Sequence, residues 1–79
     1  MERNEILAKL QTIFQEELDN DSLVITEESS ANNVDGWDSL SHVQLISAIE
    51  DEFNISFTSK EIMNWKKVGE MITSIENYL

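Results

Sequence analysis

The residues with the clearest chemical potential are Asp38 and Ser39, at the predicted start of a helix. The first turn of a helix leaves backbone N–H groups without partners, and an Asp or Ser side chain can accept hydrogen bonds from them. If Asp38 is the N-cap, its carboxylate reaches the amides of Leu40 or Ser41, and Ser39 takes the first helical position. The Ser39 hydroxyl is then spare and exposed at the positive end of the helix, where a phosphate is stabilised. The pattern predicts a serine that carries an attached group.

No second group of residues predicts catalysis or metal binding. The chain has one histidine, His42, and no cysteine, so no paired nucleophile and base can be placed. The absence of cysteine excludes disulfides and thiolate ligands and argues against zinc. The acidic residues after Asp19 fail the EF-hand pattern, because Val24 stands where glycine belongs and Ser30 where glutamate belongs. We therefore expect no catalytic residue and no structured metal site, and any reactive thiol must come from a cofactor.

Size and charge narrow the class of protein. The chain of 79 residues has no long polar linker, which predicts one domain over residues 1–79. Its net charge of −11 argues against nucleic acid and anionic membranes as partners and favours basic protein surfaces. Self-repulsion at this charge favours a monomer. No apolar run is long enough to span a membrane, and the N-terminus lacks a signal-peptide pattern, so a cytoplasmic location is expected.

Apolar spacing predicts an all-α fold, a small four-helix bundle with three main helices and one short third helix. The main helices are expected over residues 3–18, over residues 39–53 and from about Val68 to the end. Thr58 and Glu61 form a capping box that opens the short helix, which runs to about Met63. The apolar face of the first helix consists of Ile6, Leu7, Leu10, Ile13, Phe14 and Leu18, and that of the last of Val68, Met71, Ile72, Ile75 and Leu79, with Tyr78 near its edge.

A long polar connection, residues 19–37, joins the first two helices, and connections of this length are commonly functional. Trp37 is expected to anchor it to the bundle and to pack against His42 as a hydrophobic staple; contact between Trp37 and an attached group is the alternative. Trp65 is expected to pack at a corner, or else to line a pocket with Phe57 and Ile62. The apolar residues available to hold the connection are Leu23, Val24, Ile25, Ala31, Val34 and Trp37.

The helix over residues 39–53 has two distinct faces at about 100° per residue. One face is expected to join the core; it consists of Leu45, Ile46, Ile49 and Phe53, with His42 on the same side. The other face places Leu40, Val43 and Ser47 beside Gln44 and Asp51, with Glu50 and Glu52 completing an acidic rim. An apolar centre with a charged rim is typical of a protein-docking site, so this face is predicted to bind partners.

The sequence Gly36-Trp37-Asp38-Ser39-Leu40, followed by an acidic amphipathic helix, resembles the acyl carrier proteins. The resemblance covers essentially the whole chain, from the first helix through the long loop to the last helix. It implies that a phosphopantetheinyl transferase moves 4′-phosphopantetheine from coenzyme A onto Ser39, within the motif that Asp38 and Leu40 complete. The arm ends in a thiol that holds acyl groups as thioesters, and the carrier does no chemistry of its own. Asp38 is expected to present its carboxylate to a basic residue of the transferase.

Departures from the family pattern bear on partner choice. Carriers of fatty-acid synthesis usually have carboxylates at the positions of Ser41 and Gln44 and a large apolar residue at the position of Ser47. The Gly-Trp-Asp-Ser-Leu motif followed by His42 looks more like the free-standing carriers of specialised pathways. Fatty-acid, polyketide and other pathways stay open, with acyl- or aminoacyl-loading and acyl-processing enzymes as partners. One alternative is an aminoacyl or peptidyl carrier. Another is an unmodified acidic adaptor that binds basic proteins through Leu40, Val43 and the acidic rim.

Overall fold

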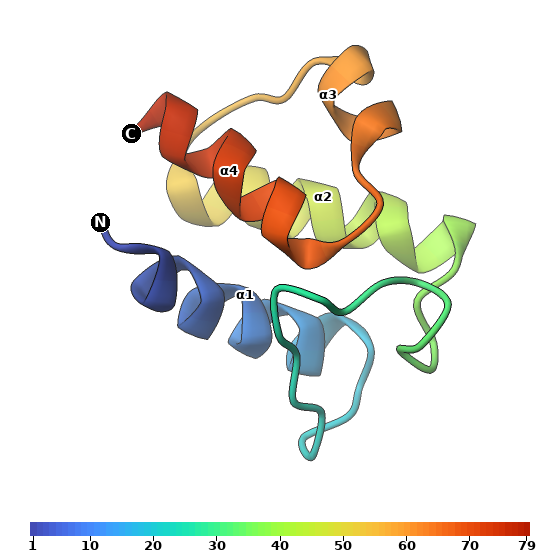
Figure 1. Ribbon diagram of the computed structural model, residues 1–79. Helices are drawn as coiled ribbons and strands as arrows, with labels where there is room; N and C mark the ends of the chain where they lie inside the picture. Colours follow the sequence, from blue (N-terminus) through green and yellow to red (C-terminus); the bar gives the residue numbers. More distant parts are fainter.

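Four helices and the loops between them make up the structure, a computed structural model that describes residues 1–79 and contains no strand. They are α1 (Arg3–Glu17), α2 (Ser39–Phe53), α3 (Ser59–Asn64) and α4 (Val68–Tyr78). Helix α1 packs against α2 and α4, while the short α3 lies on the far side of α4 from α1 (Figure 1). The predicted all-α bundle with one short third helix is confirmed. The two chain ends lie on one side of the molecule and the start of α2 on the other (Figure 1).

The helix boundaries follow from local capping. Thr58 Oγ1 accepts a hydrogen bond from the amide of Glu61 at 3.2 Å, and Glu61 Oε1 accepts one from the amide of Thr58 at 2.9 Å, as the capping box predicted. Helix α2 ends at Phe53, because the left-handed backbone of the next residue, Asn54 (φ 55°), stops the helix. Helix α1 ends one residue before the predicted Leu18, and α3 runs one residue beyond the predicted Met63.

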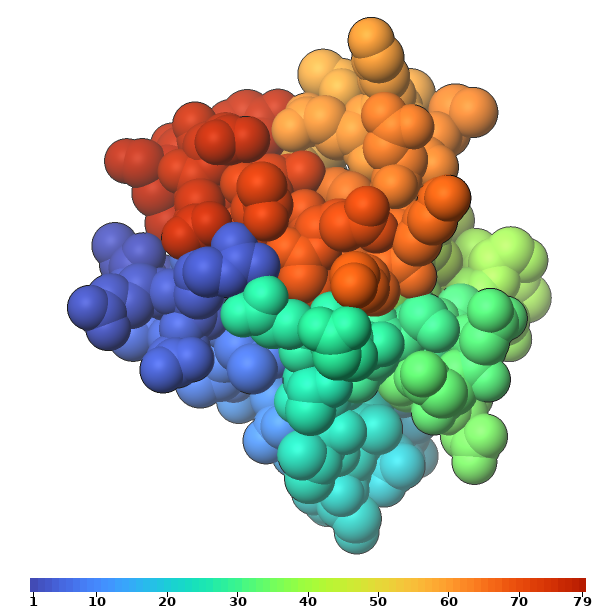
Figure 2. All heavy atoms as spheres, viewed as in Figure 1, coloured from blue at the N-terminus to red at the C-terminus, as the bar shows by residue number.

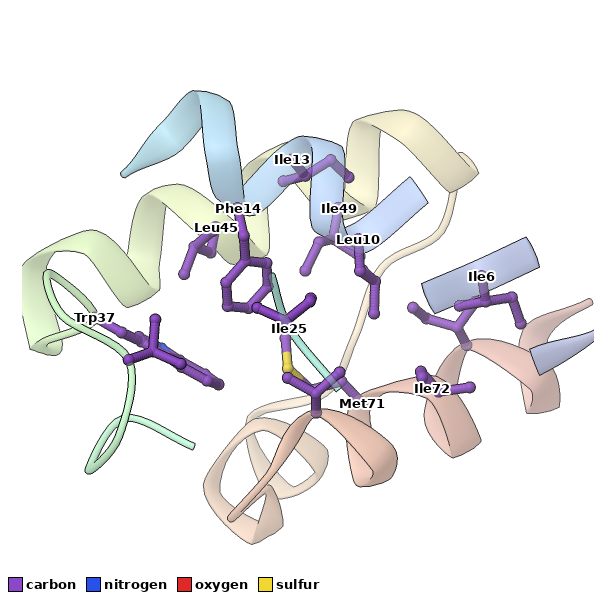
Figure 3. Close-up of a cluster of buried hydrophobic side chains, with 13 residues drawn as sticks. Ile6, Leu10, Ile13, Phe14, Ile25, Trp37, Leu45, Ile49, Met71 and Ile72 are labelled. Atoms are coloured by element: carbon purple, nitrogen blue, oxygen red, sulfur yellow. The ribbon is translucent and has the colours of Figure 1, made fainter. Parts of the chain in front are cut away.

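The core is a single cluster of side chains from α1, α2, α4 and the long connection (Figure 3). Of the positions on the predicted apolar faces, Leu7, Leu18 and Phe53 are only half-buried against the core, and two others lie outside the core cluster. Leu79 is 59% exposed because it follows the last residue of α4, and Ile46 is only half-buried between the two faces of α2. The buried hydrophobic residues are Ile6, Leu10, Ile13, Phe14, Ile25, Val34, Trp37, Leu45, Ile49, Val68, Met71, Ile72 and Ile75.

The connection before α2 is held by fewer apolar residues than the sequence suggested. Ile25, Val34 and Trp37 are buried, whereas Val24 is 71% exposed and Ala31 is exposed as well. Val24 lies in a loop without helix or strand, where its side chain is exposed while that of the neighbouring Ile25 is buried. Ala31 lies in a turn that covers the surface. Leu23 is half-buried against the core, so it contributes less than predicted.

Backbone hydrogen bonds attach this connection to the start of α4. The amides of Val68 and Gly69, the first two residues of α4, donate to the carbonyls of Ser29 at 2.9 Å and Glu27 at 2.8 Å. These carbonyls satisfy helix N–H groups that would otherwise lack partners. An added Cβ at position 69 would lie 3.1 Å from the Glu27 carbonyl oxygen, a closer approach than most Cβ atoms make, so glycine suits this position. The loop is therefore fixed to the bundle on the side that leads toward Ser39.

An arginine on α1 fastens the same region through its charged groups. Arg3 Nη2 lies 2.6 Å from Glu27 Oε1 and donates to the Gly69 carbonyl at 3.0 Å, while Nη1 lies 2.6 Å from Glu76 Oε1. The Arg3 guanidinium holds the pKa of Glu27 below its usual range. Arg3 therefore joins α1, the connection and α4.

None of the helices is both long and apolar enough to span a bilayer.

Candidate functional site

Asp38 caps α2 as predicted. Its Oδ1 accepts hydrogen bonds from the amides of Leu40 at 3.0 Å and Ser41 at 2.9 Å. The Ser41 amide contributes most to holding the pKa of the Asp38 carboxyl below its usual value, with the Leu40 amide adding to it. Asp38 is therefore ionised at neutral pH, with its charge directed at the first turn of α2.

Ser41 completes the cap, a role that its sequence position did not predict. Its hydroxyl accepts from the amide of Asp38 at 2.9 Å and donates to the carbonyl of Gly36 at 2.7 Å. Gly36 has a φ of 87°, a left-handed conformation that glycine adopts without strain and that turns the chain into the helix. The Asp-x-x-Ser spacing was the available signal, but capping boxes are usually recognised by Glu or Gln at that position.

Ser39 is left free by this arrangement. It is the first residue of α2, it is exposed, and its hydroxyl takes part in no hydrogen bond within the structure. The cap is formed by the neighbours Asp38 and Ser41, so the Ser39 hydroxyl is not needed to hold the helix. It therefore faces the surroundings at the positive end of a 15-residue helix, where a phosphate is stabilised.

An open cavity of about 270 Å³ lies directly beside Ser39. Three parts of the chain form its walls: the end of the long connection, the first turn of α2, and the junction between α3 and α4. The connection (green) and the start of α4 (orange) meet on the face shown in Figure 2. The lining residues are Ala31, Trp37, Asp38, Ser39, His42, Trp65, Lys66, Lys67 and Met71.

Trp37 and His42 form the predicted pair, but they are joined by a hydrogen bond as well as by packing. Trp37 Nε1 donates to His42 Nδ1 at 3.0 Å, and the two rings stack with centroids 6.0 Å apart. On its other side Trp37 meets the edge of Phe14 at 5.0 Å, so it anchors the connection as expected. His42 is half-buried at the cavity rather than in the core. An indole N–H can only donate, so His42 Nδ1 is the acceptor and neutral His42 carries its proton on Nε2.

The free energy of unfolding is expected to depend on pH because His42 is partly buried beside Trp37. Burial lowers the pKa of His42 below its ordinary value of 6.5. The unfolded chain therefore binds a proton at a pH where folded His42 does not, and stability falls as the pH drops through about 6.5 toward the folded pKa. Urea unfolding between pH 7.5 and pH 5.5 measures this slope. His42→Gln is the control, because glutamine can still accept from Trp37 but does not titrate, and an unchanged slope in this variant would contradict the assignment.

Trp65 both packs and lines the cavity. Its Nε1 donates to Ser74 Oγ at 2.9 Å, and its ring meets the edge of Phe57 at 4.7 Å. The predicted corner packing is therefore confirmed. Of the three residues considered for a pocket, Trp65 reaches the cavity while Phe57 and Ile62 do not. Phe57 instead packs between Trp65 and Tyr78.

The second face of α2 is exposed as the sequence suggested. Leu40 is 80% exposed and Val43 is 66% exposed. The remaining exposed residues of this face are Gln44, Ser47 and Asp51.

Glu50 and Glu52, expected at the acidic rim, have contacts within the fold. Glu50 Oε2 accepts a hydrogen bond from the amide of Phe57 at 2.7 Å, which ties the loop after α2 to the helix. Glu52 Oε2 lies 3.4 Å from Lys9 Nζ. The structure brings no three His, Asp or Glu side chains together in a way that could hold a metal ion.

The family model for the phosphopantetheine attachment site matches residues 8–75. The chain belongs to this family. An acyl carrier protein of Guillardia theta is 36% identical over 76 residues, covering 92% of this chain and 94% of the relative. One of Thermotoga maritima is 32% identical over 77 residues, covering 98% and 95%. The solution structure of a holo acyl carrier protein from Geobacter metallireducens superimposes with a TM-score of 0.84 at 41% identity, covering 90% of this chain and 82% of that one.

Membership in the phosphopantetheine attachment family and these similarities confirm the resemblance drawn from the sequence. The chain functions as an acyl carrier protein, and phosphopantetheine is its prosthetic group. The surroundings of Ser39 fit such a group. They offer a free hydroxyl at a helix N-terminus, an open cavity next to it, and two lysines on the cavity wall.

Proposed function

We propose that Ser39 bears the phosphopantetheine group and that the chain presents acyl groups to partner enzymes without catalysing a reaction itself. The observation that carries the proposal is the free, exposed Ser39 hydroxyl at the first position of α2, beside an Asp38 that already caps the helix. Leu40, the third residue of the motif, is exposed next to it. A transferase can therefore reach the hydroxyl without disturbing the helix.

Attachment is assigned to a separate phosphopantetheinyl transferase because Ser39 has no activating base of its own. Asp38 Oδ1 accepts from two backbone amides, and His42 Nδ1 accepts from Trp37. In the proposed reaction the Ser39 oxygen forms a phosphodiester with the 4′-phosphopantetheine part of coenzyme A, adenosine 3′,5′-bisphosphate leaves, and the hydroxyl proton passes to the transferase. When bound, the group supplies the thiol on which acyl groups are held, and the chain contains no cysteine that could do so.

The exposed face of α2 is proposed as the surface that partner enzymes recognise. Leu40 and Val43 supply apolar contact, Gln44 and Ser47 polar contact, and Asp51 an acidic rim. With a net charge of −11, the carrier is expected to prefer enzymes with basic docking surfaces, which raises association rates at low salt. Glu50 contributes charge to this face while its carboxylate also holds the loop before α3. A monomeric state and a cytoplasmic location stay predictions.

The cap gives a structural reason for a serine at position 41. Its hydroxyl donates to the Gly36 carbonyl, which an ionised carboxylate could not do. With neutral residues at positions 41 and 44, the proposed partners are enzymes that do not require negative charge in the first turns of α2. This favours a polyketide or other specialised pathway over fatty-acid synthesis.

Intact-protein mass spectrometry tests the proposed site. The purified chain is incubated with coenzyme A, Mg²⁺ and a broad-specificity phosphopantetheinyl transferase, and the product is digested and mapped. We expect a gain of one phosphopantetheine, located on the peptide that contains Ser39. Attachment to a different residue would contradict the assignment of Ser39. No gain by a chain that is folded by circular dichroism would contradict the carrier function at this site.

A further inference from the structure

The cavity beside Ser39 has features that modification of the serine does not by itself require. We propose that this cavity is a docking site for the phosphopantetheine arm, with Lys66 supplying the positive charge that favours its phosphodiester. The inference rests on the proposed attachment to Ser39. It adds that the loaded carrier holds its arm against its own surface.

The first support is continuity between the cavity and the attachment point. Ser39 itself forms part of the cavity wall, so a group bound to its oxygen starts at the cavity. An attached ligand loses little translational freedom when it binds, because its effective concentration near the site is already high. Weak contacts with the wall are therefore enough to hold the arm there for much of the time.

The second support is the position of an unpaired cation. Of the five basic residues, Arg3 pairs with Glu27 and Glu76, Lys9 with Glu52, and Lys67 with Glu28 at 3.2 Å. The ammonium groups of Lys60 and Lys66 have no ion-pair or hydrogen-bond partner in the structure. Only Lys66 of these two lines the cavity.

The cavity therefore contains a free positive charge in a chain whose net charge is −11. The one acidic side chain on the wall, Asp38, has its Oδ1 directed at the amides of Leu40 and Ser41. Those amides offset much of its repulsion toward an anion, so Lys66 is left to face the negative charge of a phosphodiester.

The remaining lining suits the uncharged part of the arm, which combines methyl groups and amides. Trp37, Trp65 and Met71 supply aromatic and apolar surface. Both indole N–H groups are already satisfied, by His42 and by Ser74, so the rings can accept apolar contact without leaving a polar group unpaired. The side chains of Trp37 and Met71 also reach into the core cluster (Figure 3), which fixes the wall they form.

The two tryptophans make the proposal directly measurable, because the chain contains no others. Apo and loaded forms, with complete loading verified by mass, are compared through their indole N–H signals in ¹H–¹⁵N NMR spectra. We expect both signals to shift on loading and to return toward their apo positions in loaded Lys66→Glu. The matched control is Lys60→Glu, which makes the same charge change on exposed α3 outside the cavity and should keep the full shift.

Alkylation of the arm thiol by a maleimide gives a second readout. The Lys66→Glu form is expected to react about two- to fivefold faster than the native loaded form, as is typical for the loss of one exposed charge contact. Indole signals that coincide in the apo and fully loaded forms would overturn docking while leaving the carrier function intact. A shift that persists in Lys66→Glu would overturn the role of Lys66. A missing mass gain would instead contradict the proposed function on which docking rests.

Discussion

Replacing Ser39 by alanine is expected to abolish phosphopantetheine loading while leaving the fold unchanged. The Ser39 hydroxyl is exposed and makes no hydrogen bond, so its removal should shift the melting temperature by no more than about 4 °C. Loading needs the oxygen itself, because that atom forms the new bond to phosphorus. The expected result is a complete loss of the mass gain under conditions where the native chain is fully modified. Circular dichroism and thermal unfolding verify that the variant is folded.

Ser59→Ala is the matched control for this experiment. Ser59 is also an exposed serine at the first position of a helix, α3, so the substitution removes the same atom at a site outside the motif and the proposed docking face. This variant should load completely. A Ser39→Ala chain that still gains one phosphopantetheine would rule out Ser39 as the attachment residue. Loss of loading in Ser59→Ala would show that the loss in Ser39→Ala is not specific to the attachment residue.

Replacing Phe14 by alanine is expected to cause the largest loss of stability. Phe14 is fully buried in the core, and its ring meets that of Trp37 at 5.0 Å (Figure 3). Truncation of a buried phenylalanine costs about 3–5 kcal/mol. A domain of 79 residues has a total stability of about 4–12 kcal/mol. The substitution should therefore remove between about a quarter and all of the stability, and it weakens the support of Trp37 as well.

Urea unfolding followed by circular dichroism and by tryptophan fluorescence measures this loss. Val24→Ala is the control, because Val24 is a largely exposed apolar residue of the connection, and its truncation should change the free energy of unfolding by less than about 0.5 kcal/mol. Phe14→Ala should also load more slowly, since the connection that Trp37 anchors leads directly to Ser39. A loss of less than about 1 kcal/mol would show that the contact with Trp37 is not central to the core.

The parts of this protein that depend on neighbours in sequence could be predicted well. A cap involves residues two or three positions apart, so Asp38 before Ser39 and Thr58 before Glu61 were enough to place the starts of α2 and α3. Helical spacing determined the buried face of α1 in the same way. The free hydroxyl of Ser39 follows from the same local logic, because a cap supplied by Asp38 leaves the next residue unused.

Contacts between segments distant in sequence could not be predicted, because no local periodicity reports them. The inward orientation of Ile25 rather than Val24 depends on how the connection lies against α1, where Gln11 Oε1 accepts from the Ile25 amide at 3.1 Å. Glu50 was expected only as surface charge, and its bond to the Phe57 amide forms where the chain folds back after α2.

The sequence by itself determined the approximate span of each helix, the free serine next to the cap of α2, and the family resemblance. These features depend on residue types at short fixed spacings. The tertiary structure alone decided what surrounds Ser39. Ala31, Trp65 and Lys66 reach the same cavity as Ser39 only because α4 binds the connection through the carbonyls of Glu27 and Ser29. Packing of distant segments, rather than local propensity, thus places an unpaired lysine and two tryptophans beside the attachment residue.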